Sequence, residues 1–417
     1  MVIGRKNLSL FLAVLLFVLF YYSPLFEKKS NSGVFCLKEF KNINQISGKI
    51  NSSPIKLSNS QYYTTTLQTS HVTQNQEKFS CNGKIKVMIP TKMVEAHFPG
   101  KLYSSSKSKV NTIYESGGNY TFLGKFSKNT FYVTDCIEVN WANTLNGKLS
   151  HFRAKSRLLF KRLMFYWGDA GGLLLALLTG SREYTENNIS NAFSKAGLSH
   201  ILALSGMHLS LFSSLAMFIG KKAKRKKIEF IIRIFSLIFF VWFAGFSPSL
   251  LRAFLCTSLI IFSSLIDDKK PDMIFILSLS FVLQVLISPA DLSSIAFILS
   301  YAALLGIILF NKIFKILFIK FLPNYLSSSL ASSTSAQLFT APITLLKWGT
   351  YSPIGIIATC FVSPCITFFI YTGLLCIILS LIFPFMSEFS AFFMKNIYNV
   401  IKYMVVSFSK VGGFEIR

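Results

Sequence analysis

Charged residues are scarce in this chain, and acidic residues are the scarcest. Of its 417 residues only 14% are charged, with 17 Asp and Glu against 43 Lys and Arg, while 52% are hydrophobic. Soluble domains carry about 25% charged residues, so the composition excludes an ordinary soluble protein. Several uninterrupted apolar runs approach or exceed the roughly 20 residues that a membrane-spanning helix needs. The sequence therefore predicts a polytopic α-helical membrane protein.

Several chemical signatures are missing as well. No glycine-rich loop ends in Lys-Ser or Lys-Thr, so the chain encodes no nucleotide-driven motor of that type. The seven cysteines and five histidines form no C-x-x-C pair, no zinc-like spacing and no H-x-H-x-D-H metal cluster. We therefore expect no cofactor, no metal site and no catalytic residues, and a function other than that of an enzyme.

Positive charge is concentrated in one polar segment. The net charge of the chain is +26, and residues 27–162 hold 21 basic against 7 acidic side chains, about half of that excess. A lysine-rich surface suits a polyanion such as nucleic acid, because binding releases the counterions of the phosphates. The alternative is a general bias toward Lys, Asn, Ile, Phe and Ser along the chain. Charge alone leaves these two interpretations open.

The polar residues 32–147 are typical of a small β domain. Short runs of β-branched and aromatic residues are separated by Gly83, Pro90, Pro99-Gly100 and Gly117-Gly118. Such spacing fits a small barrel or sandwich, and an OB-type barrel is one member of that class. The aromatic residues interleaved with lysines either stack on bases or fill the core of the domain: Tyr62, Tyr63, Tyr120, Phe122, Phe126, Phe131 and Tyr132. In an extracytoplasmic domain, Cys81 and Cys136 are the preferred disulfide candidate.

The remaining segments predict the membrane part. Arg5 and Lys6 precede an apolar run without a small-residue cleavage site, so residues 1–30 predict a retained first transmembrane helix with a cytoplasmic N-terminus. Residues 148–180 combine a helix of opposed basic and apolar faces with a short glycine-rich piece, which predicts an amphipathic and re-entrant segment. Residues 181–417 then form a multi-span transmembrane domain.

The basic loop 221–227 fixes the predicted orientation. Cytoplasmic loops carry an excess of Lys and Arg, so this loop lies inside and the β domain outside. We expect spans at about 200–219, 228–246, 249–266, 273–288, 293–310, 327–346, 354–383 and 390–408. Pro364 within the long run 354–383 predicts a broken helix or two short ones.

Polar residues cluster in the otherwise apolar stretch AGLSHILALSGMHLSLF, residues 196–212. It contains His200, Ser205, Gly206 and His208. Polar groups at bilayer depth are costly, so the cluster predicts either a functional site or polar contacts between helices. A dyad of Ser205 with a histidine, as in an intramembrane serine protease, is a third interpretation.

Three further motifs follow along the chain. AGFSPSLLRAFL places Arg252 in the first turns of a span, where it either reaches the outer interface or faces a polar cavity. DLSSIAFILSYAALLGIILF begins with Asp291, a plausible helix N-cap. AQLFTAPITLLKWGTYSPIG carries Gln337 within a span. Lys195, Arg182 and Arg252 are the basic residues expected at the outer end of these helices.

These four motifs, in this order, resemble the competence domain of the ComEC family. GLSHILALSGMHLSL is similar to its AGL-H-LLA-SG-H pattern, and the later three resemble its P-S-x-x-R-A, FQLSF and AQ segments. The resemblance also implies that the β domain is OB-like and extracytoplasmic. It implies a multi-pass channel of the bacterial cytoplasmic membrane that translocates single-stranded DNA during natural transformation. Its site residues, as path or gate, would be His200, Ser205, Gly206, His208, Arg252 and Gln337, with Lys195 at the mouth.

The implied partners are single-stranded DNA, membrane lipids, an extracytoplasmic DNA receptor and a cytoplasmic ATP-driven motor or helicase. Self-association into a homo-oligomer is left open. Two departures from the family pattern matter: FQLSF becomes FILSY, with Ile298 in place of a glutamine, and the sequence ends without the metallo-β-lactamase-like domain of many members. Any nuclease function is then expected from another protein. The alternative functions are a transporter of small molecules or lipid precursors, and an intramembrane serine protease.

Overall fold

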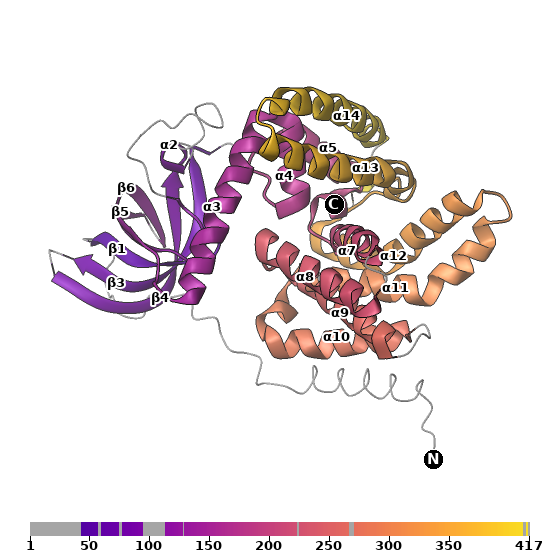
Figure 1. The fold of residues 1–417 in the computed structure, drawn as a ribbon, viewed down its shortest axis with the longest axis horizontal. Coiled ribbons are helices and arrows are strands. Elements are labelled where there is room, and N and C mark those ends of the chain that lie inside the picture. Colours follow the sequence, from indigo (N-terminus) through magenta and orange to yellow (C-terminus); the bar gives the residue numbers. More distant parts are fainter. Residues whose placement is uncertain are drawn as a thin grey trace, which may run out of the picture.

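The computed structural model describes residues 43–56, 60–74, 77–94, 113–127, 129–222, 225–266, 271–411 and 414–415. The predicted first transmembrane helix in residues 1–30 lies outside the described residues. A sheet domain occupies one side of the molecule and a helical domain the other, with the long helix α3 between them (Figure 1). The sheet strands are β1 (Ile43–Ile50), β2 (Ile55–Lys56), β3 (Tyr62–Gln74), β4 (Glu77–Pro90), β5 (Asn119–Ser127) and β6 (Thr130–Asn140), with the short helix α2 (Thr91–Val94) after β4.

The strands pair in the order β1-β5-β6-β4-β3-β2, and β1 also pairs with β3. Following the pairings from β1 to β3, β4, β6 and β5 therefore leads back to β1. All are antiparallel except that of β4 with β6, which runs parallel through Lys86–Met88 and Thr130–Tyr132. Alternate side chains point inward, as the two-residue period of a strand requires.

Most of the aromatic residues singled out in the β domain lie in its core. Tyr63, Tyr120, Phe122 and Phe131 are at most 1% exposed, so they fill the interior. They cannot stack on a bound strand, and the stacking interpretation is wrong for these four. Tyr62 and Tyr132 alternate with buried neighbours and are half-buried, and their rings meet edge to face at 5.5 Å.

The predicted disulfide between Cys81 and Cys136 is wrong. The structure does not join the two residues, and Cys136 carries a free thiol. They lie on β4 and β6, but that strand pairing covers only Lys86–Met88 and Thr130–Tyr132, so the cysteines are not cross-strand neighbours. Burial raises the pKa of the Cys136 thiol to about 11, which keeps the thiol protonated at neutral pH.

The helical domain follows without further sheet except the short pair β7 (Thr350–Tyr351) and β8 (Phe414–Glu415) among the described residues. Its helices are α3 (Leu145–Tyr166), α4 (Gly168–Thr179), α5 (Asn187–Lys195), α6 (Ser199–Leu202), α7 (Gly206–Lys221), α8 (Lys226–Ala244), α9 (Pro248–Ile266), α10 (Met273–Ile287), the 3₁₀ helix η3 (Pro289–Ser293), α11 (Ile295–Phe318), α12 (Asn324–Trp348), α13 (Gly355–Ile382) and α14 (Met386–Ser409). In Figure 1, α11 and α12 extend together as a hairpin on the side away from the sheet.

Three of the described helices are long and apolar enough to cross a membrane: Pro248–Leu265, Ile295–Phe318 and Gly355–Ile382. The last corrects the prediction of a broken helix, because α13 runs unbroken through Pro364. A proline removes one backbone hydrogen bond, which neighbouring groups can compensate in a long packed helix. Helix α4 is shorter, with 12 residues, and its apolar residues from Ala170 to Leu178 are buried among α3, α13 and α14.

The predicted span at 200–219 is also divided. Helix α6 ends at Leu202, Ala203 is extended, and α7 begins only at Gly206. His200 and His208 therefore lie on two different helices rather than on one. The predicted cap at Asp291 is wrong as well, since this residue lies within η3 and Ser294 caps α11.

Candidate functional site

The first motif forms the entry to helix α7. Ser205 is extended, with φ −132° and ψ 176°, and it caps the helix. Its backbone N–H donates to Nδ1 of His208 at 3.2 Å, and its Oγ lies 3.4 Å from the same nitrogen. The His208 side chain is 1% exposed, and its Nε2 has no hydrogen-bond partner among the described residues. The pair thus shapes a helix N-terminus whose free N–H groups carry partial positive charge.

Arg252 of the second motif lies against that N-terminus. A Cβ placed on Gly206 would stand 3.8 Å from Nη1 of Arg252, an ordinary van der Waals contact, so the guanidinium packs directly on the first turn of α7. The guanidinium donates to Oγ of Ser300 from Nε at 2.9 Å and from Nη2 at 2.6 Å. Ser300 belongs to the third motif and comes from α11. No carboxylate of the described residues forms a salt bridge with Arg252.

A polar network lies behind this contact, between α9, α10 and α11. Gln284 donates to the Pro248 carbonyl at 2.9 Å and to Asp291 at 3.0 Å, and it accepts from the Tyr301 hydroxyl at 3.1 Å. Ser280 lies 3.4 Å from the same hydroxyl. Asp291 therefore orients Gln284 instead of capping a helix. Gln284 was missed from the sequence, although a glutamine within an apolar run was a usable signal.

The fourth motif meets the start of the first. Gly197 has φ +71°, and a Cβ there would stand 2.9 Å from the Ser352 carbonyl oxygen and 3.0 Å from Cα of Gly355. Gln337 accepts a hydrogen bond from the Tyr351 hydroxyl at 2.8 Å. A Cβ on Gly355 would stand 3.1 Å from its Nε2. The two glycines thus allow α13 and the segment before α6 to touch beside Gln337.

The predicted site residues therefore fall into two contacts on one part of the fold. Gly206 and Arg252 meet, with Ser205 and His208 in the adjoining turn. Gln337 meets the backbone near Gly197 through Gly355. Lys195 and His200 lie next to this second contact with exposed side chains: the Ser352 hydroxyl donates to the Lys195 carbonyl at 2.8 Å, and His200 hydrogen-bonds the Gly197 backbone. Arg182 is exposed and makes neither contact.

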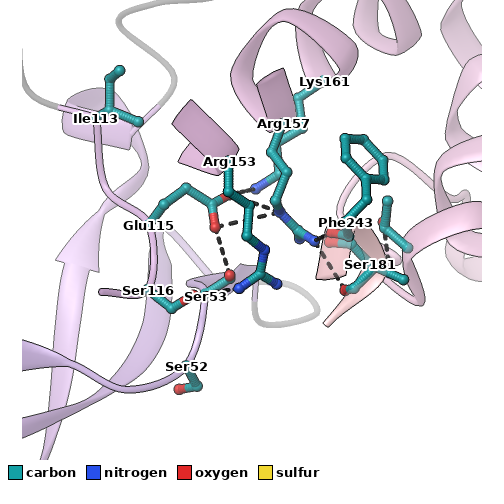
Figure 2. Close-up of polar contacts among 12 residues, drawn as sticks. Ser52, Ser53, Ile113, Glu115, Ser116, Arg153, Arg157, Lys161, Ser181 and Phe243 are labelled. Carbon is teal, nitrogen blue, oxygen red and sulfur yellow. Dashed lines mark hydrogen bonds and ion pairs between the residues drawn. The ribbon is translucent and has the colours of Figure 1, made fainter. Parts of the chain in front are cut away.

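A second polar cluster joins the sheet domain to the helices (Figure 2). Glu115, in the loop before β5, lies 3.4 Å from Nε of Arg157 and 3.2 Å from Nζ of Lys161 on α3. Lys161 also pairs with Glu183 at 3.1 Å, and Arg157 donates to the carbonyls of Phe243 and Ala244 at 2.7 and 2.9 Å. One charged cluster thereby connects four parts of the fold: a loop of the sheet domain, α3, the α4–α5 loop and the C-terminus of α8.

The charges in this cluster are fully buried and mutually paired. Burial alone would raise the pKa of Glu115, but Arg157 and Lys161, together with the hydroxyl of Ser53, lower it to about 2. For Lys161, burial lowers the pKa, while Glu183 and Glu115 outweigh burial and raise it. Glu115 and Lys161 therefore stay ionised at neutral pH. This cluster could not be predicted from the sequence, since its four residues are spread from position 115 to position 183.

Comparison with known proteins identifies the family. The family model described as "Competence protein" matches residues 177–416, more than half of the chain. The chain belongs to the competence protein family. The match covers all four motifs and both contacts described above.

A curated relative supports this assignment. "ComE operon protein 3" of Bacillus subtilis (strain 168) is 28% identical over 269 residues, which cover 62% of this chain. The chain thus resembles a competence protein of the ComEC type, and it spans about a third, 34%, of that relative's length. No solved structure matches this chain.

Proposed function

We propose that this competence protein is a multi-pass channel of the bacterial cytoplasmic membrane that translocates single-stranded DNA during DNA uptake. The observation that carries the proposal is the convergence of the family's motifs on Arg252, a cation that faces a helix N-terminus and has no carboxylate partner among the described residues. Membership in the competence family and the name of the Bacillus relative support DNA uptake as the process.

Charge at the two ends of the helices supports the orientation. The entry to α7 and the start of α9 lie together, because Ser249 donates to the Leu204 carbonyl at 2.7 Å. The C-terminus of α8 joins the sheet domain through Arg157. The opposite ends of α7 and α8 carry the basic residues Lys221, Lys222, Arg225, Lys226 and Lys227. An excess of basic residues favours the cytoplasmic side, so the sheet domain and the motif contacts lie outside.

Arg252 is suited to contact the phosphates of a passing strand. A guanidinium binds phosphate through two parallel hydrogen bonds, and a helix N-terminus also attracts anions. Ser300 holds the guanidinium through a neutral hydroxyl, which leaves its positive charge uncompensated. A cation in a spanning helix is costly, and the phosphates of a polyanionic substrate would compensate its charge.

We further propose that the sheet domain is an OB-like barrel that collects the strand. Its pairing order, with one parallel contact between β4 and β6, supports this assignment. Tyr62 and Tyr132 lie on the outward side, and Lys84, Lys86 and Lys125 are exposed on β4 and β5. Aromatic rings and lysines on one sheet surface suit stacking of bases and tracking of the backbone.

The expected partners follow from what the channel needs. A strand has to be delivered to the outer mouth, which requires an extracytoplasmic DNA receptor. Pulling requires a cytoplasmic ATP-driven motor or helicase, because the sequence has no P-loop. We propose no chemistry for the channel itself.

The proximity of Ser205 and His208 supports the protease alternative only in part. Their 3.4 Å separation is within reach of a weak hydrogen bond, but the same Nδ1 already accepts from the Ser205 backbone N–H. No described residue orients the ring from Nε2, whereas a nucleophile's base is normally held by a third group. Labelling of Ser205 by a fluorophosphonate would establish the protease and contradict the channel.

The test of the proposal is a DNA-uptake assay in a transformable strain that depends on this protein. We expect Arg252→Ala to keep DNA bound at the cell surface but to prevent its arrival in the cytosol, and Arg252→Lys to restore part of the import. Ser264→Ala, at the other end of α9, is the matched control. Normal import with Arg252→Ala would remove Arg252 from the path and favour the transporter of small molecules.

A further inference from the structure

Helix α3 has its polar and apolar faces reversed relative to a helix on a water-soluble protein. Arg157 and Lys161 are 4% and 5% exposed, while Leu145, Leu149 and Phe152 are 81%, 54% and 61% exposed. At about 100° per residue, these three apolar residues and Leu159, which is 50% exposed, fall within about 80° of the helix circumference. They form one continuous stripe, which we call the outer stripe of α3.

The paired charges explain why α3 cannot turn this stripe inward. Its opposite face is fixed by the ion pairs of Arg157 and Lys161 with Glu115 and by the bonds of Arg157 to the end of α8. Rotating the helix would leave these charges buried and unpaired, which is far costlier than exposing leucines. The exposed stripe is therefore a stable feature of the fold that requires an apolar environment.

The outer stripe continues into the exposed apolar side of α8. The Phe152 ring stacks on Trp242 at 6.0 Å, and Trp242 lies 5.9 Å from Phe239. Phe239 and Phe246 are 48% and 79% exposed. Helix α8 packs on α9, one of the helices that are long and apolar enough to span a membrane. The stripe is thus contiguous with the exposed apolar surface of a helix that packs on a candidate membrane span.

Two exposed lysines flank the stripe on one side. Lys148 and Lys155 are exposed and lie next to the stripe on the helix circumference. Lysines in this position reach from an apolar surface to the headgroup level of a membrane, where they favour anionic lipids. A soluble protein partner would not account for an apolar surface shared with a membrane helix.

We propose that the N-terminal half of α3 lies in the headgroup–acyl boundary of a phospholipid bilayer, with Lys148 and Lys155 at anionic headgroups. In this position α3 holds the sheet domain at the membrane surface, because its other face carries the ion pairs to Glu115. The inference rests on the membrane location of the helical domain and is independent of the transported substrate.

The test uses the full chain in vesicles of phosphatidylcholine and phosphatidylglycerol, with the photocrosslinking residue benzoylphenylalanine at single positions. Positions 149 and 152 probe the stripe, and position 82, an exposed site on β4, is the matched control. All three side chains are exposed, so the replacements leave the packing intact. We expect lipid adducts at 149 and 152 at least tenfold above those at 82.

Two results would overturn the proposal. One is a lipid yield at 149 and 152 no higher than at 82, which would place the stripe in water. The other is crosslinking of these positions to a second copy of the chain, which would make the stripe a subunit interface.

Replacing Lys148 and Lys155 by Gln tests the headgroup contact separately. It should lower the adduct yield severalfold in vesicles with phosphatidylglycerol, and leave the yield unchanged in phosphatidylcholine alone. An equal effect in both would refute the headgroup contact.

Discussion

The buried carboxylate of Glu115 gives the most quantitative prediction, for the substitution Glu115→Gln. Its pKa is lowered from 4.5 to about 2 in the folded protein. Because one pKa unit corresponds to about 1.4 kcal/mol, the ionised carboxylate stabilises the junction between the sheet domain and α3 by about 3 kcal/mol at pH 7. Removing one partner of a buried ion pair costs a similar amount, about 3–5 kcal/mol.

Amide hydrogen exchange of the full chain in nanodiscs measures this effect locally. We expect Glu115→Gln to reduce the protection of amides in residues 113–117 and in α3 about 100-fold at pH 7, which is the equilibrium equivalent of 3 kcal/mol. Glu77→Gln, at an exposed position of the same domain, is the control and should change nothing. Equal protection in the two variants would refute the assignment of Glu115 as the charge that holds the junction.

The pH dependence provides an independent check. The carboxyl has a lower pKa in the folded than in the unfolded protein, so its contribution is complete above about pH 5 and is lost as the pH falls toward 2. At about pH 3 roughly half of the 3 kcal/mol should remain. After correction for intrinsic exchange rates, the difference between wild type and Glu115→Gln should shrink over this window. A difference that stays constant with pH would mean that lost packing, rather than lost charge, is responsible.

Three other substitutions test the site and the sheet domain. Gly197→Ala should lower the midpoint of thermal unfolding. A residue with a Cβ in the left-handed conformation costs about 1–2 kcal/mol, and the Cβ would lie 2.9 Å from the Ser352 carbonyl oxygen. An unchanged midpoint would contradict the close contact between this segment and α13. Tyr132→Ala should weaken binding of single-stranded oligonucleotides to the full chain by about 1–3 kcal/mol while leaving the fold intact, as measured by fluorescence anisotropy at fixed salt; unchanged affinity would exclude stacking on this ring. Phe131→Ala, one residue away but fully buried, should instead destabilise the sheet domain by about 3–5 kcal/mol in denaturant unfolding, and a stable variant would contradict the placement of Phe131 in the core.

The sequence was most informative where the physical signal is local. Apolar runs predicted the helices from α8 to α14 to within a few residues of most ends, since each run is long and bounded by polar residues. The alternation of side chains in β3 and β6 was also present in the sequence. The sequence could not show which of Tyr62 and Tyr63 points inward, because both faces of β3 carry an aromatic residue.

The missed features depend on tertiary contacts. The break in the apolar stretch 200–219 was not predicted, because the extended Ser205 is stabilised by a contact with the His208 ring. The charges of Arg157 and Lys161 suggested a solvated face of α3, but their acidic partners come from distant segments and draw them inside. The contact of Arg252 with Ser300 joins residues 48 positions apart, and only their shared order in the family motifs pointed to one site.

The central claim, that this competence protein conducts DNA, is tested most directly by following fluorescent DNA into the DNase-protected cytosol of a strain with and without the gene. The account predicts that deletion abolishes the cytosolic signal while DNA remains bound at the cell surface. It also predicts that Arg252→Ala behaves like the deletion although the protein is present in the membrane. Unchanged import in the deletion strain, when the parent strain takes up DNA, would contradict the claim and assign the channel a different substrate.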